Sequence, residues 1–288
     1  MKFTKLIKKS LNVVCFFFLV IVVSIIMKIF LFASFKIPTG SMEPVILSGD
    51  HVLVNKLLIG PRIYRDFGFL RGEKTPLKRI KGLKNIQRND ILVFNYPYTF
   101  QGTLKMSPNQ FYIKRCIAVP GDTFTIENGI YTIKGHPEPA GNYSAQLQLS
   151  QTPDEVFDKH TLHCFPDDTA YRWTIKHFGP LYIPGKGDCL EVNLPNIVLY
   201  RSLIQYETGQ KITVQDEQLF LDGDTLFAYT FAQNYYFMAG DYVSGSQDSR
   251  YWGLLPEDFV VGKVAFIRKS VDPHTGKFRW KTFFKAVK

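Results

Sequence analysis

The chain has 288 residues, a formal net charge of +10 and 15% aromatic residues, and this length is enough for the hydrophobic core of a globular enzyme. Its basic residues do not form a recognisable nucleic-acid-binding motif, so we expect no nucleic-acid partner; an anionic membrane surface would attract them equally well. The abundance of Phe, Tyr, Val, Ile and Thr favours pleated, half-buried surfaces and predicts a mainly β fold.

The N-terminal part of the sequence predicts a transmembrane anchor. Residues 10–34, "SLNVVCFFFLVIVVSIIMKIFLFAS", form an apolar run whose only charge is Lys28, near its far end. The run is long enough to span a bilayer, and a lysine in that position can extend to the interface. A cleaved secretory signal is the alternative, but its apolar region would be shorter, and "LFASFKIP" is a poor cleavage site. The positive-inside rule places residues 1–9 in the cytoplasm, because this segment contains Lys2, Lys5, Lys8 and Lys9.

After the anchor, short strand-like runs alternate with turn-forming residues. The runs show period-2 or short buried apolar patterns bounded by Gly, Pro, Asn and Asp, so we expect strands of a sheet or a small barrel. They are residues 50–56, 90–97, 111–122, 122–133, 217–224 and 262–269. The basic stretch 71–90 predicts a solvated loop.

The middle of the chain predicts an inserted second domain. Residues 134–234 have a looser pattern, with a helix predicted at 196–208 and a short helical candidate at 152–158. We therefore divide the rest of the chain into a core of residues 35–133 and 235–288 and an inserted β-rich accessory domain of residues 134–234.

Ser41 lies in a turn shaped by Pro and Gly, "IPTGSMEP", shortly after the anchor. A serine hydroxyl is a weak nucleophile until a base removes its proton. The sequence has no G-x-S-x-G motif, and none of its six histidines lies in a recognisable triad context, which leaves lysine as the base to consider. Strand alternation places Lys114 on an apolar face with Tyr112 and Cys116, where burial lowers the pKa of an amine. Arg115 points to the other face, and we interpret it as an ordinary solvent-exposed charge.

Four stretches of the sequence belong together: "IPTGSMEPVILSGDHVLVNK", "NDILVFNYP", "YIKRCIAVPGD" and "GDYVSGSQDSRYWGLLPEDFVVGKV". In their order and approximate spacing they resemble the conserved boxes of bacterial type I signal peptidases. The resemblance covers the anchor and residues 35–56, 89–122 and 240–264, but not the segments between them. It implies a signal-peptidase catalytic core, anchored in the bacterial inner membrane with its catalytic domain on the periplasmic side. It further implies a serine endopeptidase that removes signal peptides from exported proteins after small-x-small sites, without a cofactor or metal.

The resemblance also implies roles for individual residues. Ser41 would be the nucleophile and Lys114 the general base. The Ser41 N–H and the Thr39 hydroxyl would stabilise the oxyanion, and Ser246 would orient the lysine amine.

The remaining implied site residues support the dyad or bind the substrate. Asp248 and Arg250 would form an ion pair that shapes the site. The walls of the pockets for small residues at substrate positions −3 and −1 would be Phe35, Ile37, Tyr112 and Ile113.

The sequence departs from the family pattern at three positions. Thr39 stands where many members have serine, but it keeps a hydroxyl donor. Ala118 replaces a usual glycine and Tyr242 a common asparagine, which leaves the local backbone and pocket shape open. Two further residues, Cys164 and Cys189, lie in the predicted insertion, and a disulfide between them stays open.

Two rival functions differ from signal-peptide removal. The first is another Ser/Lys peptidase, such as a self-cleaving repressor, which needs a DNA-binding domain, or a dedicated conjugation-system processing enzyme. The second is a non-catalytic anchored scaffold, which the presence of Ser41, Lys114 and Ser246 disfavours. The expected partners are signal peptides of secretory precursors and membrane lipid. Residues 160–164, "HTLHC", lack the fourth ligand and the spacing of a zinc site.

Overall fold

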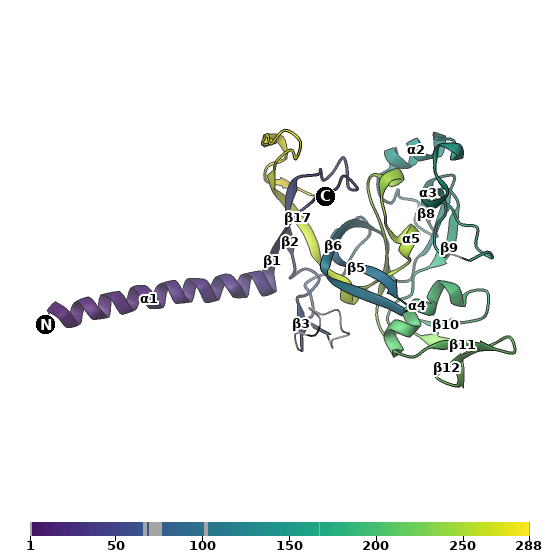
Figure 1. Ribbon diagram of the computed structural model, residues 1–288, viewed down its shortest axis with the longest axis horizontal. Coiled ribbons are helices and arrows are strands. Elements are labelled where there is room, and N and C mark those ends of the chain that lie inside the picture. The colour runs from purple at the N-terminus through teal and green to yellow at the C-terminus, as the bar shows by residue number, and fades with distance from the viewer. Residues whose placement is uncertain (1, 66–67, 69–76, 101–102, 167, 288) are drawn as a thin grey trace.

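The computed structural model consists of a long N-terminal helix attached to a β-rich body (Figure 1). Helix α1 (Lys2–Ile26) continues as a π-helical turn, η1 (Met27–Leu31). An uninterrupted apolar run without Pro or Gly suits a helix, which satisfies its own backbone hydrogen bonds in a lipid environment. The structure describes residues 2–65, 68, 77–100, 103–166 and 168–287.

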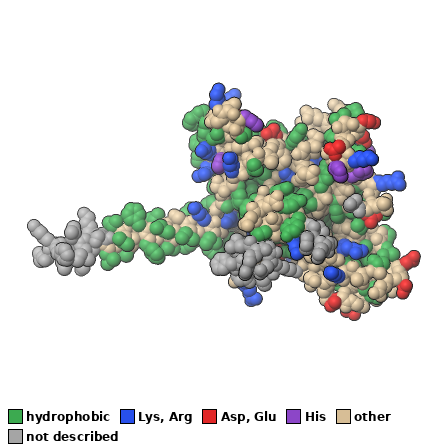
Figure 2. Space-filling model, viewed as in Figure 1, with side chains coloured by type: hydrophobic (Ala, Val, Ile, Leu, Met, Phe, Trp, Pro, Cys, Tyr) green, Lys and Arg blue, Asp and Glu red, His purple; other side chains and the backbone are tan. Residues whose placement is uncertain are grey.

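The stretch Leu11–Leu31 is long and apolar enough to cross a membrane and has no part of its most apolar window buried in the body. Apolar side chains cover the helix along this stretch (Figure 2). The helix ends before Ser34, the predicted limit of the anchor, because Phe32 already begins strand β1 and pairs with Asn55. The body therefore starts directly at the end of this apolar segment.

Antiparallel pairing organises the main sheet of the body. Its strand order is β1-β2-β17-β5-β6-β15-β16, with β18 added to β17. In β2 every second residue is buried, which is the period-2 pattern from which this strand was predicted. The strands are β1 (Phe32–Lys36), β2 (Asp50–Asn55), β5 (Ile91–Phe100), β6 (Thr103–Ala118), β15 (Tyr235–Ala239), β16 (Leu255–Pro256), β17 (Val260–Ser270) and β18 (Lys285–Ala286).

Smaller sheets and short helices lie around the main sheet. A three-stranded sheet has the order β8-β7-β9, and three further small sheets pair β3 with β4, β10 with β14, and β12 with β11 and β13. Their strands are β3 (Arg62–Tyr64), β4 (Leu77–Arg79), β7 (Thr123–Glu127), β8 (Ile130–Ile133), β9 (Phe178–Tyr182), β10 (Cys189–Glu191), β11 (Ile212–Gln215), β12 (Gln218–Leu221), β13 (Asp224–Thr225) and β14 (Ala228–Thr230). The helices of the body are α2 (Tyr143–Gln151), α3 (Lys159–Leu162), α4 (Ile197–Thr208) and α5 (Ser249–Trp252), with 3-10 turns η3 (Asp154–Val156), η4 (Val243–Gly245), η5 (Glu257–Phe259) and η6 (Trp280–Thr282).

The mainly β prediction is confirmed, and most predicted elements are found. All six strand-like runs contain strands, and α4 matches the helix predicted at 196–208. The helical candidate at 152–158 forms only the 3-10 turn η3. The solvated-loop prediction is wrong at Arg79, which donates to the backbone oxygens of Gly60 (2.7 Å), Glu257 (2.7 Å) and Val260 (2.8 Å). Residues 71–76 of that stretch lie outside the described residues.

Two hydrophobic clusters form the core, and the larger one crosses the predicted domain boundary. Phe124 and Phe237, from the predicted core, pack with Phe178, from the predicted insertion, at ring-centroid distances of 6.0 and 5.5 Å. Strand β9 of the insertion also pairs with β7. The limits of an accessory domain at 134–234 therefore stay a prediction. The smaller cluster lies beneath the segment that joins β1 to β2 and includes Met42 and Ile46, both fully buried.

Asp50, at the start of β2, anchors one end of that joining segment. Its carboxylate is fully buried and accepts hydrogen bonds from the Leu47 N–H, at 2.9 Å, and from the Ser270 hydroxyl. The guanidinium of Arg279 lies 3.7 Å away. A buried carboxylate in this position fixes the backbone because the Leu47 N–H and the Ser270 hydroxyl would otherwise lack an acceptor.

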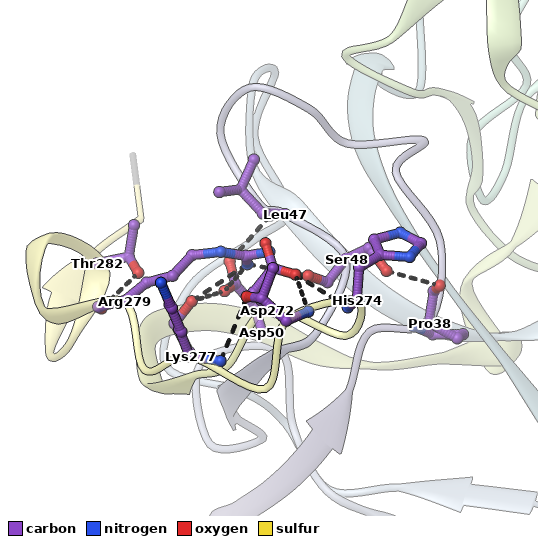
Figure 3. Close-up of polar contacts among 11 residues, drawn as sticks. Pro38, Leu47, Ser48, Asp50, Asp272, His274, Lys277, Arg279 and Thr282 are labelled. Carbon is purple, nitrogen blue, oxygen red and sulfur yellow. Dashed lines mark hydrogen bonds and ion pairs between the residues drawn. The ribbon is translucent and has the colours of Figure 1, made fainter.

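Arg279 extends this contact to the C-terminal part of the chain (Figure 3). It donates to the Ser48 carbonyl oxygen at 2.9 Å and to the Asp272 carboxylate at 3.0 Å. The Ser48 hydroxyl in turn donates to the Pro38 carbonyl oxygen at 2.9 Å. The two ends of the joining segment are thus held together and to the hairpin that follows β17.

We predict that Asp50→Ala lowers the free energy of unfolding by about 3 kcal/mol, because it leaves the Leu47 N–H and the buried Ser270 hydroxyl without their acceptor and removes an ion-pair partner of Arg279. Urea unfolding of the full chain in detergent, followed by near-ultraviolet circular dichroism, measures the change. Glu155→Ala, which removes an exposed carboxylate, is the control and should change stability by less than about 0.5 kcal/mol. Equal stability of the two variants would contradict the anchoring role of Asp50.

Candidate active site

Ser41 lies on a turn in the segment between β1 and β2. Met42 and Ile46 insert into the smaller core cluster, and the Ile46 N–H donates to the Met42 carbonyl oxygen at 3.0 Å. The Glu43 N–H donates to the Gly40 carbonyl oxygen at 2.9 Å. The apolar residue after Ser41 therefore fixes the turn, while Ser41 itself faces a pocket.

Lys114 approaches Ser41 from strand β6. Its Nζ lies 2.6 Å from the Ser41 Oγ, and the residue is only 4% exposed. Burial lowers the pKa of the Lys114 amine to about 8, with a contribution in the same direction from Arg250 that Asp248 opposes. A substantial part of the amine is thus neutral near pH 8 and able to accept the serine proton.

A buried ion pair borders the lysine. Asp248 and Arg250 are both fully buried and lie 2.8 Å apart. Burial alone would raise the pKa of Asp248, but the Arg250 guanidinium holds that pKa below its ordinary value. Asp248 also accepts from the Gly240 N–H at 3.0 Å, and Arg250 donates to the Val243 carbonyl oxygen at 2.7 Å. The pair therefore fixes the segment between β15 and α5 against the dyad.

The prediction that Arg115 is an ordinary solvent-exposed charge is wrong. Arg115 is buried and makes two hydrogen bonds of 2.7 Å to the Asp241 carboxylate. It also donates to the Asn89 carbonyl oxygen at 2.8 Å. Alternation failed here because β6 is an interior strand whose residues are all buried from Ile113 to Ala118, so neither face is open to solvent.

Ser246 and Gly240 lie together beside Ser41. A Cβ atom on Gly240 would lie 2.2 Å from the Ser246 Oγ and 2.5 Å from the Ser41 carbonyl oxygen, so only glycine fits between them. The Ser246 Oγ is buried and has no hydrogen-bond partner within the described part of the chain. The implied hydrogen bond to the Lys114 amine is thus not formed, and the orienting role of Ser246 stays a prediction.

A cavity of about 270 Å³ lies next to the dyad. Thr39 contributes to its lining, and so do the four predicted wall residues, Phe35, Ile37, Tyr112 and Ile113. Sequence reasoning missed other lining residues, among them Val93, Phe111, Gly245 and Gln247.

Phe111 shows why alternation did not find every wall residue. Its ring centroid lies 5.0 Å from that of Phe35, although it is the sequence neighbour of Tyr112, which alternation places on the other face. The pairing of β5 with β6 shifts register between Asn95 and Pro97, next to the point where Phe111 pairs. Such an irregularity re-aims side chains.

The structure also bears on Ala118 and on the two cysteines of the predicted insertion. Ala118 lies within β6 opposite Phe237, an extended position that alanine adopts readily. Cys164 and Cys189 are both free thiols. No group of three or more His, Cys, Asp or Glu that could hold a metal ion is found among the residues the structure describes.

Most of this chain is similar in sequence to known proteins. The family described as signal peptidase, peptidase S26, matches residues 10–268. Signal peptidase I of Haemophilus influenzae is 26% identical, over 94% of this chain and 74% of its own. Those of Buchnera aphidicola (Schizaphis graminum) and Pseudomonas aeruginosa are 28% and 26% identical, over 86% of this chain and 71% and 68% of theirs. With a match over most of its length, the chain belongs to the signal peptidase family, peptidase S26, and is a peptide-bond hydrolase of the signal-peptide-processing class.

Proposed function

We propose that this peptidase removes signal peptides after small-x-small sites with Ser41 as nucleophile and Lys114 as general base. The observation that carries the proposal is the 2.6 Å contact between the Lys114 Nζ and the Ser41 Oγ in a buried site. Among the residues that the structure describes, no histidine lines the cavity. The lysine is therefore the group in position to take the serine proton.

The reaction follows from this contact. The neutral Lys114 amine accepts the hydroxyl proton as the Ser41 Oγ attacks the scissile carbonyl carbon, and the carbonyl oxygen becomes an oxyanion. The Ser41 N–H, which has no acceptor among the described residues, and the Thr39 hydroxyl are available to donate to it. The Lys114 ammonium then returns the proton to the leaving amine as the peptide bond breaks. In the second half, the amine takes a proton from a water molecule as its oxygen attacks the acyl carbon. The ester bond to the Ser41 Oγ then breaks, the Lys114 ammonium returns the proton to that oxygen, and the signal peptide leaves with a free carboxylate.

The cavity supports the preference for small residues before the cut. Its volume of about 270 Å³ lies at the lower limit of pockets that hold small molecules. Ile37 and Ile113 contribute apolar walls, and both are buried, so the pocket has little freedom to widen. We infer that alanine or a similarly small side chain occupies it at position −1 and again at −3.

The position of the body supports action at a membrane surface. Trp280, Phe283 and Phe284, near the C-terminus, are 76%, 41% and 60% exposed, and Lys281 and Lys285 lie among them in sequence. Exposed aromatic and basic side chains are typical of the membrane–water interface. The C-terminal segment lies at the end of the body that carries the helix (Figure 1), whereas acidic side chains gather mostly at the other end (Figure 2). We infer a bacterial inner-membrane protein with its N-terminus in the cytoplasm and its catalytic body on the periplasmic side.

The dyad predicts a pH profile with a single rising limb. Since the amine must be neutral and its pKa is lowered to about 8, kcat/KM should rise as the pH increases through 8 and level off above it. Lys114→Met has no basic group, and the guanidinium of Lys114→Arg stays protonated, so neither side chain can accept the serine proton. Each variant should lose at least about 100-fold in kcat/KM. Cleavage of a precursor peptide with an Ala-x-Ala site, measured from pH 5 to 10, gives both results.

Lys211→Met, which removes an exposed lysine, is the matched control and should keep the parent profile. Circular dichroism verifies that each variant is folded. Near-parent cleavage by folded Lys114→Met would exclude Lys114 as the base.

Substrate specificity tests the pocket separately. Precursors with Ala at −1 should be cleaved with a kcat/KM at least about 100-fold higher than matched precursors with Phe at −1, because the larger ring has no room between the buried walls. Product masses locate each cut. Comparable rates for the two precursors would be incompatible with the pocket assignment.

Topology tests the membrane inference. Protease added to intact spheroplasts should digest the catalytic body and leave a fragment containing the anchor, because the four lysines of the first nine residues hold that end inside. Immunoblots with tags at either end follow both fragments, and a cytoplasmic protein serves as the control for intact spheroplasts. Full protection of the body would contradict this topology.

A further inference from the structure

The segment after β15 carries an aromatic side chain to which the mechanism assigns no role. Tyr242 lies between Asp241 and η4, and it is 51% exposed. Its backbone N–H donates to the Ser41 carbonyl oxygen at 3.1 Å. A large, solvent-accessible ring is therefore attached to backbone that contacts the nucleophile directly.

The backbone on the N-terminal side of Tyr242 is fixed. The Asp241 side chain is paired with Arg115, and the Asp241 carbonyl oxygen accepts from the Asn142 side chain at 3.0 Å. The Gly240 N–H donates to Asp248 at 3.0 Å. An aromatic side chain on such a backbone loses little conformational entropy when it contacts a substrate.

The ring also extends the surface of the substrate cavity. A Cβ atom on Gly245 would lie 2.2 Å from the Tyr242 Cε1, so the ring lies directly against Gly245. Gly245 and Gln247 line the cavity together with Ser41 and Lys114. One side of the ring is thus supported by a residue of the cavity wall, and half of the residue's surface remains open to a ligand.

The course of the chain indicates which part of a precursor passes the ring. The apolar segment of a precursor lies in the membrane, as the anchor does, so residues before the cut leave the membrane near the start of β1. Phe35 lies on β1, six residues before Ser41. Phe35 and Ile37 line the cavity, whereas Tyr242 contacts Ser41 through its backbone N–H and lies against Gly245 at the cavity wall. For a precursor whose residues before the cut run along Phe35 and Ile37 to Ser41, we infer that the residues beyond the scissile bond continue toward Tyr242.

We propose that Tyr242 is a specificity-determining residue that contacts the side chain of the first or second residue of the mature protein and favours an apolar side chain there. The inference rests on the proposed function, since it requires a precursor cut beside Ser41. An aromatic ring offers a broad apolar surface on which a side chain such as leucine can pack. Glycine has no side chain and makes no such contact, so the ring favours leucine over glycine.

The test is a set of precursor peptides with one Ala-x-Ala signal that differ only in Leu or Gly at +1, or in Leu or Gly at +2. For the parent, kcat/KM should be about 3- to 10-fold higher with Leu than with Gly at one of these positions, mainly through a lower KM. Tyr242→Asn should bring this ratio close to 1, and Tyr242→Phe, which keeps the ring, should retain it. Phe227→Asn removes another exposed aromatic residue, 72% exposed, and should leave the ratio unchanged.

The outcomes separate this inference from the proposed function. The role of Tyr242 would be overturned if the parent showed no preference for Leu over Gly at either position. It would also be overturned if Tyr242→Asn kept the parent's Leu-to-Gly ratio of kcat/KM, with or without an equal loss of kcat/KM on both peptides. Cleavage by the parent of the same peptides with Ala or Phe at −1 tests the proposed function. If the parent cleaved neither peptide, or cleaved the Ala and Phe peptides at equal rates, the proposed function itself would be contradicted.

Discussion

A lysine amine buried at hydrogen-bond distance from a serine hydroxyl is the interaction on which the rest of the site depends. The amine is useful only while burial disfavours its charged form, and nearby carboxylates oppose this by raising its pKa. Asp248 and Asp241 are such carboxylates, and each is paired with an arginine, Arg250 and Arg115 respectively. The arginines therefore do more than hold the fold: they neutralise negative charges that would otherwise keep Lys114 protonated.

The fold assembles this site from distant parts of the chain. Ser41 follows β1 at one end of the main sheet, Lys114 lies on the interior strand β6, and Tyr242 follows β15 near the other end. The turn that carries Ser41 reaches the segment after β15, where the Ser41 carbonyl oxygen accepts a hydrogen bond from the Tyr242 N–H. Met42 in the smaller core, together with Asp50 at the base of the segment, limits its movement. Ser41, the proposed nucleophile, thus lies where the two ends of the sheet meet, close to where the long N-terminal helix enters the body.

The strands and the long apolar helix could be predicted from the sequence, because period-2 patterns and a long apolar run are local signals. The pairing of Ser41 with Lys114 was proposed from the resemblance of short motifs. The sequence did not allow the burial of Arg115 or Arg79 to be predicted, since their partners are carboxylates and carbonyl groups supplied by remote segments. Phe111 was missed because a register shift interrupts alternation. The limits of an inserted domain stay a prediction, since side chains from both sides of the predicted boundary share one core.

The most direct test of this account is the ionisation of Lys114 itself. Titration of ¹⁵N-labelled lysine amines by NMR, on the full chain in detergent micelles, resolves the pKa of individual side chains without reference to turnover. The account predicts one lysine that titrates near pH 8 and disappears from the spectrum of Lys114→Met. It would be contradicted if every lysine, Lys114 included, titrated near the ordinary value of about 10.4.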